Sequence, residues 1–269
     1  MSDQQNRKPM DLRRRGIYIL PNLFTTGALF AGFFAIVQAM NMRYELAAIA
    51  IFAAIVLDGL DGRVARMTHT QSEFGAEYDS LSDMVSFGVA PALVVYEWTL
   101  KGLGKWGWFA AFIYCVGTAL RLARFNTNIE VVDKSHFQGL PSPAAAALVS
   151  SFVLVMRDNH YSGDVVSVAA AVLTVFAGFS MVSNFRFFSF KSLNRRMVPF
   201  IAVFLFALFF ILVSVDPPII LFLLFFGYSL SGYVTYLWGR YGKRDETVAA
   251  EPPQEVESPS PAENEDVYR

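Results

Sequence analysis

The chain has 269 residues, of which 54% are hydrophobic and 17% charged, and its mean hydropathy is +0.40. This composition is that of a polytopic membrane protein and argues against a soluble domain. The net charge of −1 is uninformative by itself, because the basic residues lie between apolar runs and many of the acidic ones gather near the C-terminus. The single cysteine, Cys115, excludes an intramolecular disulfide and a multi-cysteine metal site.

The chain begins with a basic segment, residues 1–15, which contains the stretch RKPMDLRRR directly before an apolar run. A basic stretch in this place is typical of an orientation signal or of a contact with anionic lipids, so we expect no nucleic-acid partner. The apolar run that follows is longer than the core of a signal peptide and has no A-x-A-like cleavage site. We therefore expect a retained first span.

Apolar runs recur along the chain at lengths that suit a bilayer. A hydrocarbon core about 30 Å thick needs about 20 apolar residues per helix. On this measure we predict eight spans, at residues 19–40, 44–66, 73–99, 107–126, 141–157, 164–184, 197–214 and 217–239. The predicted fold is an all-α, polytopic membrane bundle over residues 16–240. The last segment, 241–269, is rich in Pro, Glu and Ser, and we expect it to be a disordered acidic tail.

The basic residues are unevenly distributed between the two sides of this bundle. With the N-terminus inside, all but four of the 22 lie on the inner side, and the four outside are Arg43, Lys101, Lys105 and Arg157. The positive-inside rule thus predicts that both termini and the end of the second span face the cytoplasm. With no targeting segment recognised, we expect a multi-pass protein of a cell inner membrane.

Four aspartates lie where the second span ends and the third begins, in the stretch DGLDGRVARMTHTQSEFGAEYDSLSD. Asp58 and Asp61 are three residues apart and Asp79 and Asp83 are four apart, so on helices each pair shares one face. Small residues accompany the aspartates on these faces and leave room for a bulky ligand near the backbone: Gly62, Ala65 and Gly75.

Four carboxylates at adjoining helix ends repel one another unless a cation lies among them. Carboxylate oxygens without His or Cys nearby select hard ions, which indicates a pair of Mg²⁺ or Mn²⁺ ions. Such a metal pair, bridged by shared carboxylates, is a recurrent arrangement for phosphoryl chemistry. The alternative, in which the aspartates cap helices and pair with Arg63 and Arg66, accounts for one or two of them but not for four.

The same stretch carries D-x2-D-G-x2-A-R-x8-G-x3-D-x3-D, which resembles the signature of the CDP-alcohol phosphatidyltransferases at every position: Asp58, Asp61, Gly62, Ala65, Arg66, Gly75, Asp79 and Asp83. The resemblance implies an integral-membrane helical fold with a six-helix core, usually homodimeric, and an active site at the cytoplasmic border. It also implies a reaction in which an acceptor hydroxyl displaces CMP from a CDP-linked lipid or alcohol.

Carried over position by position, the resemblance implies two divalent metals per active site. Asp58, Asp61 and Asp79 would bind the first. Asp58, Asp79 and Asp83 would surround the second. Asp83 is also similar to the proposed general base of the family.

The implied site for the CDP-linked lipid combines signature residues with residues of the first span: Gly62, Ala65 and Gly75 as the floor of the cytidine pocket, Arg66 as a contact to phosphate or to the carboxylates, and Asn22 and Thr25. Asn22 and Thr25 open the first span three residues apart, where an amide and a hydroxyl can bond to a nucleotide or a phosphate. For Asn22 the alternative is a helix cap, with Pro21 breaking the chain before it.

Three further motifs, read together, resemble the phosphatidylserine synthase branch of this family. They are LPNLFTTGALFAGFFAI (20–36), ALRLARFN (119–126) with FQGLPSPAAAA (137–147), and SMVSNFRFFSFKSL (180–193). The expected count of eight spans agrees with that branch. The resemblance implies transfer of the phosphatidyl group from CDP-diacylglycerol to the hydroxyl of L-serine, which yields phosphatidylserine and CMP. The implied partners are these two substrates, the lipid bilayer and a second copy of the chain.

Four basic residues are candidates for binding the serine carboxylate or the lipid phosphates: Arg121, Arg124, Arg186 and Lys191. Arg121 and Arg124 are three residues apart at an inner helix end, and an acceptor with a carboxylate calls for a guanidinium fork. The alternative for these two is interfacial snorkelling. For Arg186 and Lys191 the alternative is that they follow only the positive-inside rule.

Rival functions remain open at the level of the sequence. The nearest keeps the chemistry and changes the acceptor to glycerol 3-phosphate, inositol phosphate or choline. A more distant rival is a divalent-cation transporter, since carboxylates within a membrane can mark an ion path. The aspartates gather on one side, beside glycines and arginines, whereas a transporter predicts aspartates spread through the depth of the membrane.

Overall fold

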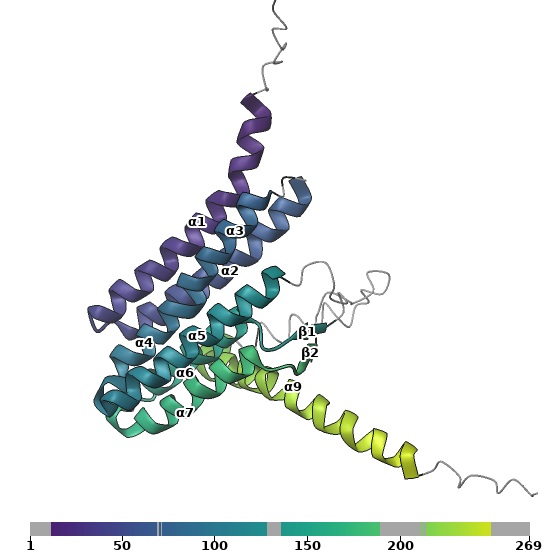
Figure 1. The fold of residues 1–269 in the computed structure, drawn as a ribbon. Helices are drawn as coiled ribbons and strands as arrows, with labels where there is room; N and C mark the ends of the chain where they lie inside the picture. Colours follow the sequence, from purple (N-terminus) through teal and green to yellow (C-terminus); the bar gives the residue numbers. More distant parts are fainter. Residues whose placement is uncertain are drawn as a thin grey trace, which may run out of the picture.

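The chain folds as a helical bundle (Figure 1), and this computed structural model describes residues 12–68, 70, 72–127, 136–188, 211 and 214–248. These ranges contain the α-helices α1 (Leu12–Met40), α2 (Tyr44–Thr68), α3 (Glu73–Asp83), α4 (Ala90–Trp98), α5 (Lys105–Thr127), α6 (Ser142–Asp158), α7 (Gly163–Val182) and α9 (Pro217–Val248). A π-helical turn, η1 (Met84–Val89), joins α3 to α4, and a 3-10 turn, η2 (Leu100–Leu103), precedes α5. Two short strands, β1 (His136–Gln138) and β2 (Arg186–Phe188), pair antiparallel and connect the segments before α6 and after α7.

Four of the described helices are long and apolar enough to cross a membrane. They comprise Leu20–Met40 of α1, Lys105–Thr127 of α5, Gly163–Val182 of α7 and Pro217–Tyr236 of α9. The prediction of an all-α membrane bundle is therefore confirmed, with the β1–β2 ribbon as a small addition. The count of eight spans stays a prediction, because most of the seventh expected span, 197–214, lies outside the described residues.

The helix ends follow the apolar runs closely, and the differences lie at the two ends of the chain. α1 begins at Leu12, inside the expected basic segment 1–15, and residues 1–11 are not described. α9 continues to Val248, so residues 241–248 are helical although we expected them to belong to a disordered tail. Nothing in 241–248 is a proline, and its Lys, Arg and Glu residues are good helix formers.

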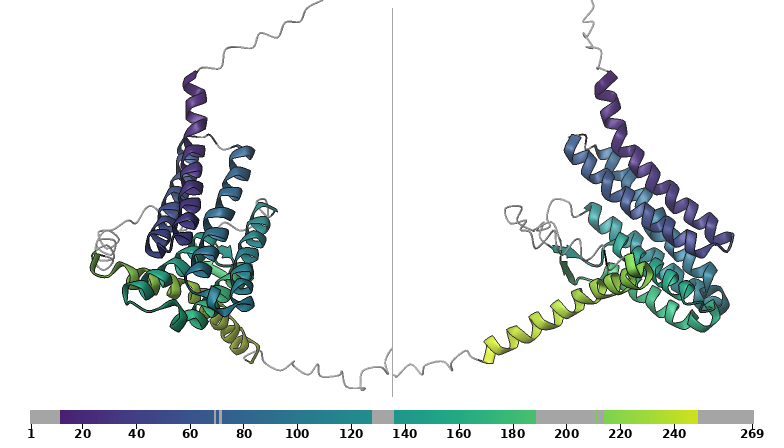
Figure 2. Two further views of the ribbon diagram at one scale, coloured as in Figure 1. Left: turned by 90° about the vertical axis from the view of Figure 1, so that its left-hand side faces the viewer. Right: turned by 180° about the vertical axis from the view of Figure 1, so that it is seen from behind.

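The helices run up and down, so that the ends of neighbouring helices gather at the two ends of the bundle (Figure 1). α1 packs along α2, α5 along α7, and α6 lies between α2 and α9. The first turns of α1 extend beyond the other helices, and the C-terminal part of α9 projects away from the bundle at an angle to the rest (Figure 2). We call the end where α2 finishes and α3 begins the site end, and the opposite end the far end.

Small side chains let the central helices approach closely. α6 is the most enclosed helix, and its run of Ala145, Ala146 and Ala147 is completely buried. Between α5 and α7, a Cβ added at Gly117 would stand 2.5 Å from the carbonyl oxygen of Gly178, a separation that real atoms do not adopt. Because lipid tails are as apolar as the helices, such close contacts are a main source of cohesion in a membrane bundle.

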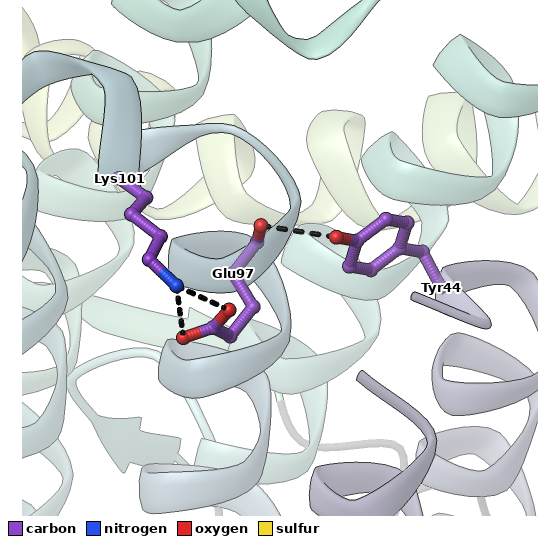
Figure 3. A network of polar contacts seen from close by, with 3 residues as sticks. All are labelled: Tyr44, Glu97 and Lys101. Atoms are coloured by element: carbon purple, nitrogen blue, oxygen red, sulfur yellow. Dashed lines mark hydrogen bonds and ion pairs between the residues drawn. The ribbon is translucent and has the colours of Figure 1, made fainter. Parts of the chain in front are cut away.

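Polar contacts tie the helices together at the far end. The hydroxyl of Tyr44 donates a hydrogen bond of 3.2 Å to the backbone oxygen of Glu97, whose carboxylate forms an ion pair of 3.0 Å with Lys101 (Figure 3). The hydrogen bond with Glu97 raises the pKa of the exposed Lys101 ammonium group. Arg157 and Glu45 form a second ion pair of 3.6 Å across α6 and α2. This end thus holds charged groups that serve cohesion, while the aspartates lie at the opposite end.

The third expected span, 73–99, is not a uniform α-helix, since η1 interrupts it directly after Asp83. Pro91 has no N–H to donate to the backbone oxygen of Phe87 four residues earlier, and that oxygen accepts a hydrogen bond of 2.9 Å from the hydroxyl of Tyr114 on α5. The hydroxyl of Ser86 donates to the backbone oxygen of Ala28 on α1 at 3.0 Å. These contacts hold η1, the turn that follows Asp83, between α1 and α5.

Candidate metal centre and active site

The site end brings the two aspartate pairs together. Asp58 and Asp61 lie in the last turns of α2, and Asp79 and Asp83 lie in α3. One carboxylate oxygen from each of Asp58, Asp61 and Asp79 falls within 4.8 Å of the other two. Across the two helices, the carboxyl group of Asp83 lies beside that of Asp58, and the carboxyl group of Asp79 beside that of Asp61.

The local sequence explains why these side chains converge. The hydroxyl of Ser72 caps α3 by accepting a hydrogen bond of 3.0 Å from the backbone N–H of Gly75, so the helix starts at Glu73, six residues before Asp79. Spacings of three and four residues then place each aspartate pair on one helix face. The short connection between α2 and α3 turns both faces toward each other.

The donor set fits a hard divalent cation. The Oδ1 atom of Asp79 is buried and has no hydrogen-bond partner among the described residues, and an unpaired buried carboxylate oxygen is costly without a cation. In the same described part of the chain, the group of residues that could hold a metal contains aspartates only. All-oxygen ligands suit Mg²⁺ or Mn²⁺.

The alternative of aspartates that cap helices or pair with arginines does not fit the geometry. Asp58 and Asp61 lie inside α2, and the cap of α3 is Ser72. The two ion pairs found among the described residues, those of Lys101 and Arg157, are at the far end. Arg63 and Arg66 are exposed, although Arg66 is close enough to Asp61 to interact electrostatically.

Thr25 of α1 is bonded to the aspartate cluster itself. Its hydroxyl donates a hydrogen bond of 2.7 Å to Oδ2 of Asp61, and both residues are almost fully buried. Its backbone oxygen accepts a hydrogen bond of 3.1 Å from the hydroxyl of Ser82, the neighbour of Asp83. One residue of α1 therefore contacts both aspartate-bearing helices, and its expected contact to a nucleotide or a phosphate stays a prediction.

Asn22 lies one turn before Thr25 and faces Gly75, since its Oδ1 would be 3.5 Å from a Cβ added at that glycine. The alternative role of Asn22 as a helix cap is wrong, because α1 passes through Pro21 without a break. A proline inside a helix removes one backbone hydrogen bond, and the packing of a membrane helix compensates for that loss.

The small residues of the signature are half-buried and leave space beside the aspartates. A Cβ added at Gly62 would meet only the Nη1 atom of Arg66, at 3.6 Å. One at Gly75 would meet the Ser72 hydroxyl at 3.1 Å. Ala65 follows Gly62 on the same face. The Ser72 hydroxyl and the Asn22 amide thus occupy the space at Gly75, whereas the open strip at Gly62, next to the carboxylates, is suited to a flat or bulky ligand.

The two candidate arginines of α5 point to different partners. Nη1 of Arg121 donates a hydrogen bond of 2.6 Å to the hydroxyl of Ser142, and its guanidinium interacts electrostatically with Asp83 and Asp58. Nη1 of Arg124 donates to Oδ1 of Asn184, after the end of α7, at 3.1 Å. Arg121 therefore belongs to the aspartate cluster, whereas Arg124 ties α5 to the segment before β2.

The other two basic candidates, Arg186 and Lys191, follow α7 in the sequence. Arg186 is the first residue of β2, and only its backbone is described. Lys191 lies outside the described residues.

Several polar residues next to the aspartates have no predicted role in the sequence. On either side of Asp79, Tyr78 shares a hydrogen bond of 2.9 Å with the hydroxyl of Thr26, and Ser80 bonds to the amide of Asn126 at 3.0 Å. Asn126 ends the motif ALRLARFN, so the motif marks the right segment but not the contact. Hydroxyl and amide partners of this kind are common throughout membrane helices and carry no distinctive sequence signal.

A sequence profile of the CDP-alcohol phosphatidyltransferases matches residues 18–176, more than half of the chain. The chain belongs to this family. The matched part runs from α1 into α7 and contains all four aspartates, so the predicted resemblance is confirmed. In this family of transferases, the aspartate cluster at the site end is the candidate active site.

Three relatives from different organisms share one name. A CDP-diacylglycerol–serine O-phosphatidyltransferase of Helicobacter pylori is 39% identical over 190 residues, which cover 71% of this chain and 80% of the relative. Proteins of the same name from Methanocaldococcus jannaschii and Bacillus subtilis are 35% identical over 189 residues and 33% identical over 172 residues. They cover 70% and 64% of this chain, and 83% and 91% of their own lengths. The similarity agrees with the branch that the three secondary motifs indicate.

Proposed function

We propose that this CDP-alcohol phosphatidyltransferase transfers the phosphatidyl group of CDP-diacylglycerol to the hydroxyl of L-serine. The serine oxygen forms a new bond to the phosphorus of the phosphatidyl group, the bond from that phosphorus to the bridging oxygen of the diphosphate breaks, and CMP leaves with the bridging oxygen. The convergence of Asp58, Asp61, Asp79 and Asp83 at one end of the bundle carries the proposal. The names of the relatives support serine as the acceptor.

The four aspartates would hold two divalent ions, Asp58, Asp61 and Asp79 the first, and Asp58, Asp79 and Asp83 the second. When bound, Mg²⁺ or Mn²⁺ would neutralise the diphosphate and stabilise the charge that develops on the departing CMP. The unpaired Oδ1 of Asp79 supports this assignment.

Asp83 is our candidate for the general base. It lies beside Asp58 in the cluster, and the guanidinium of Arg121, a cation that can hold the acceptor, interacts electrostatically with both carboxyl groups. A serine hydroxyl is a weak acid, so removal of its proton by an adjacent carboxylate lowers the barrier to attack on phosphorus.

Residues on the same side of the cluster would bind the CDP-lipid. We assign the floor of the cytidine pocket to Gly62, Ala65 and Gly75, and the open strip at Gly62 supports this assignment. Asn22 lies against Gly75 at the rim of that strip, and Arg66 is near enough to contact phosphate. Thr25 contributes to this binding site by donating a hydrogen bond to Asp61.

Arg121 is the best candidate for binding the acceptor carboxylate, because the carboxylate and hydroxyl of serine are attached to adjacent carbon atoms. The group that binds the one must lie beside the group that deprotonates the other, and Arg121 lies beside Asp83. Arg124, Arg186 and Lys191 remain candidates for contacts to lipid phosphate at the same end of the bundle.

We further propose that the site end faces the cytoplasm in a cell inner membrane and that the protein acts as a homodimer. Three of the four basic residues that we assigned to the outer side, Arg43, Lys101 and Arg157, lie at the far end, and Lys105 begins α5 there. By contrast, Arg63, Arg66, Arg121 and Arg124 lie near the ends of α2 and α5 at the site end, and this distribution supports the orientation.

Release of CMP by the purified full-length protein tests the reaction. Labelled CDP-diacylglycerol is offered with Mg²⁺ or Mn²⁺ and with L-serine, glycerol 3-phosphate, inositol phosphate or choline as the acceptor. We expect CMP and phosphatidylserine only when L-serine is the acceptor. Turnover with glycerol 3-phosphate but not with serine would refute the acceptor, and metal flux into proteoliposomes without CMP release would favour a transporter.

A further inference from the structure

The side chain of Arg121 is anchored by a hydrogen bond to Ser142. Ser142 is the first residue of α6, its side chain has no exposed surface, and its hydroxyl accepts the 2.6 Å hydrogen bond from Nη1 of Arg121. The two residues are brought together from helices α5 and α6. A bond to a fixed, buried hydroxyl restricts a side chain that would otherwise have many rotamers.

The position of Arg121 depends on this anchor. Arg121 lies near the end of α5, where a free arginine can extend toward lipid headgroups or water. Instead its guanidinium interacts with Asp83 and Asp58 and lies near Tyr228 of α9. The bond to Ser142 occupies one N–H group, and the planar guanidinium keeps further donors that can bind a carboxylate in a fork.

We propose that Ser142 is a positioning residue that holds Arg121 beside Asp83 and thereby sets the affinity of the enzyme for an acceptor bearing a carboxylate. This inference rests on the proposed function. Ser142 itself touches neither substrate, and its effect is transmitted through the orientation of the guanidinium. Loss of the anchor should therefore weaken acceptor binding and leave the CDP-lipid, which binds along Gly62 and Gly75, largely unaffected.

The substitution Ser142→Ala tests this, with Ser151→Ala as the matched control. Ser151 is also a fully buried serine of α6, but its hydroxyl donates to the backbone oxygen of Leu148 in the same helix at 3.0 Å. In the CMP-release assay we expect Ser142→Ala to raise the KM for L-serine about tenfold, as for a lost hydrogen bond to a charged group, with less than about a twofold change in the KM for CDP-diacylglycerol. Ser151→Ala should leave both constants unchanged.

A double-mutant cycle separates positioning from general stability. In an Arg121→Lys background, which lacks the fork, Ser142→Ala should change the serine KM less than about twofold, because the partner it orients is already gone. Ser142→Cys covers the case in which alanine disturbs folding, since sulfur has nearly the same shape and accepts hydrogen bonds weakly. It should raise the serine KM in the same direction.

The inference is overturned if Ser142→Ala behaves like Ser151→Ala, if it raises both KM values together, or if it acts equally in the Arg121→Lys background. Its failure is distinguishable from failure of the proposed function. The latter is decided by the wild-type protein, which must release CMP with L-serine before any KM for serine exists.

Discussion

The hydrogen bond from Thr25 to Asp61 offers a direct test of how the aspartate cluster is held. The substitution Thr25→Val keeps the shape of the side chain and removes the hydroxyl that donates to Oδ2 of Asp61 at 2.7 Å. Because Asp61 is only 3% exposed, water cannot readily replace the lost donor. The substitution should therefore disturb the orientation of Asp61 in the cluster without emptying space in the bundle.

The expected magnitude follows from the kind of bond. A hydrogen bond to a charged group contributes about 1.5–3 kcal/mol, and about 1.36 kcal/mol corresponds to a factor of ten. Loss of a residue that orients a metal ligand typically costs about 10–100-fold in metal affinity or activity. We accordingly expect kcat/KM for CMP release to fall about 10–100-fold, and half-maximal activity to need a higher Mg²⁺ or Mn²⁺ concentration.

Thr174→Val is the matched control for this measurement. Thr174 is a buried threonine of α7 whose hydroxyl donates to the backbone oxygen of Ala170 four residues earlier, just as the hydroxyl of Thr25 reaches that of Pro21. Only Thr25 also contacts an aspartate. A Thr25→Val enzyme with the same metal dependence and turnover as Thr174→Val would refute the role that we give to this hydroxyl.

Three further substitutions test the base, the nucleotide pocket and the packing. Asp83→Asn should lower CMP release at least about a hundredfold while the protein still binds CDP-diacylglycerol; unchanged turnover would contradict the assignment of the base. Gly62→Val, which fills the open strip, should raise the KM for CDP-diacylglycerol without lowering the midpoint of thermal unfolding, and an unchanged KM would place the nucleotide elsewhere. Gly117→Ala should lower the midpoint of thermal unfolding clearly, because the added Cβ would collide with the backbone of Gly178. The control Gly227→Ala should not lower it, because a Cβ there meets no atom within 4 Å. Equal midpoints for these two variants would disprove the close packing of α5 on α7.

Much of the fold could be predicted from the sequence because the constraint is local. An apolar run must be long enough to cross the bilayer, and each turn between runs breaks it, so the ends of α2, α5, α6 and α7 fall within a few residues of their expected positions. The interruption at η1 could not be predicted in this way. The contacts that Ser86 and Phe87 make there join residues far apart in the chain, which the length of an apolar run does not reveal.

The sequence by itself determined the family and the aspartate pairs, since spacings of three and four residues place side chains on one helix face whatever surrounds the helix. Only the tertiary structure decided how those faces are completed. Thr25 donates a hydrogen bond to Asp61, and Arg121 differs from Arg124 in facing the aspartates, although both arginines belong to one motif. The physical reason is that a hydrogen bond between helices depends on their packing, and the spacing within either helix carries no information about it.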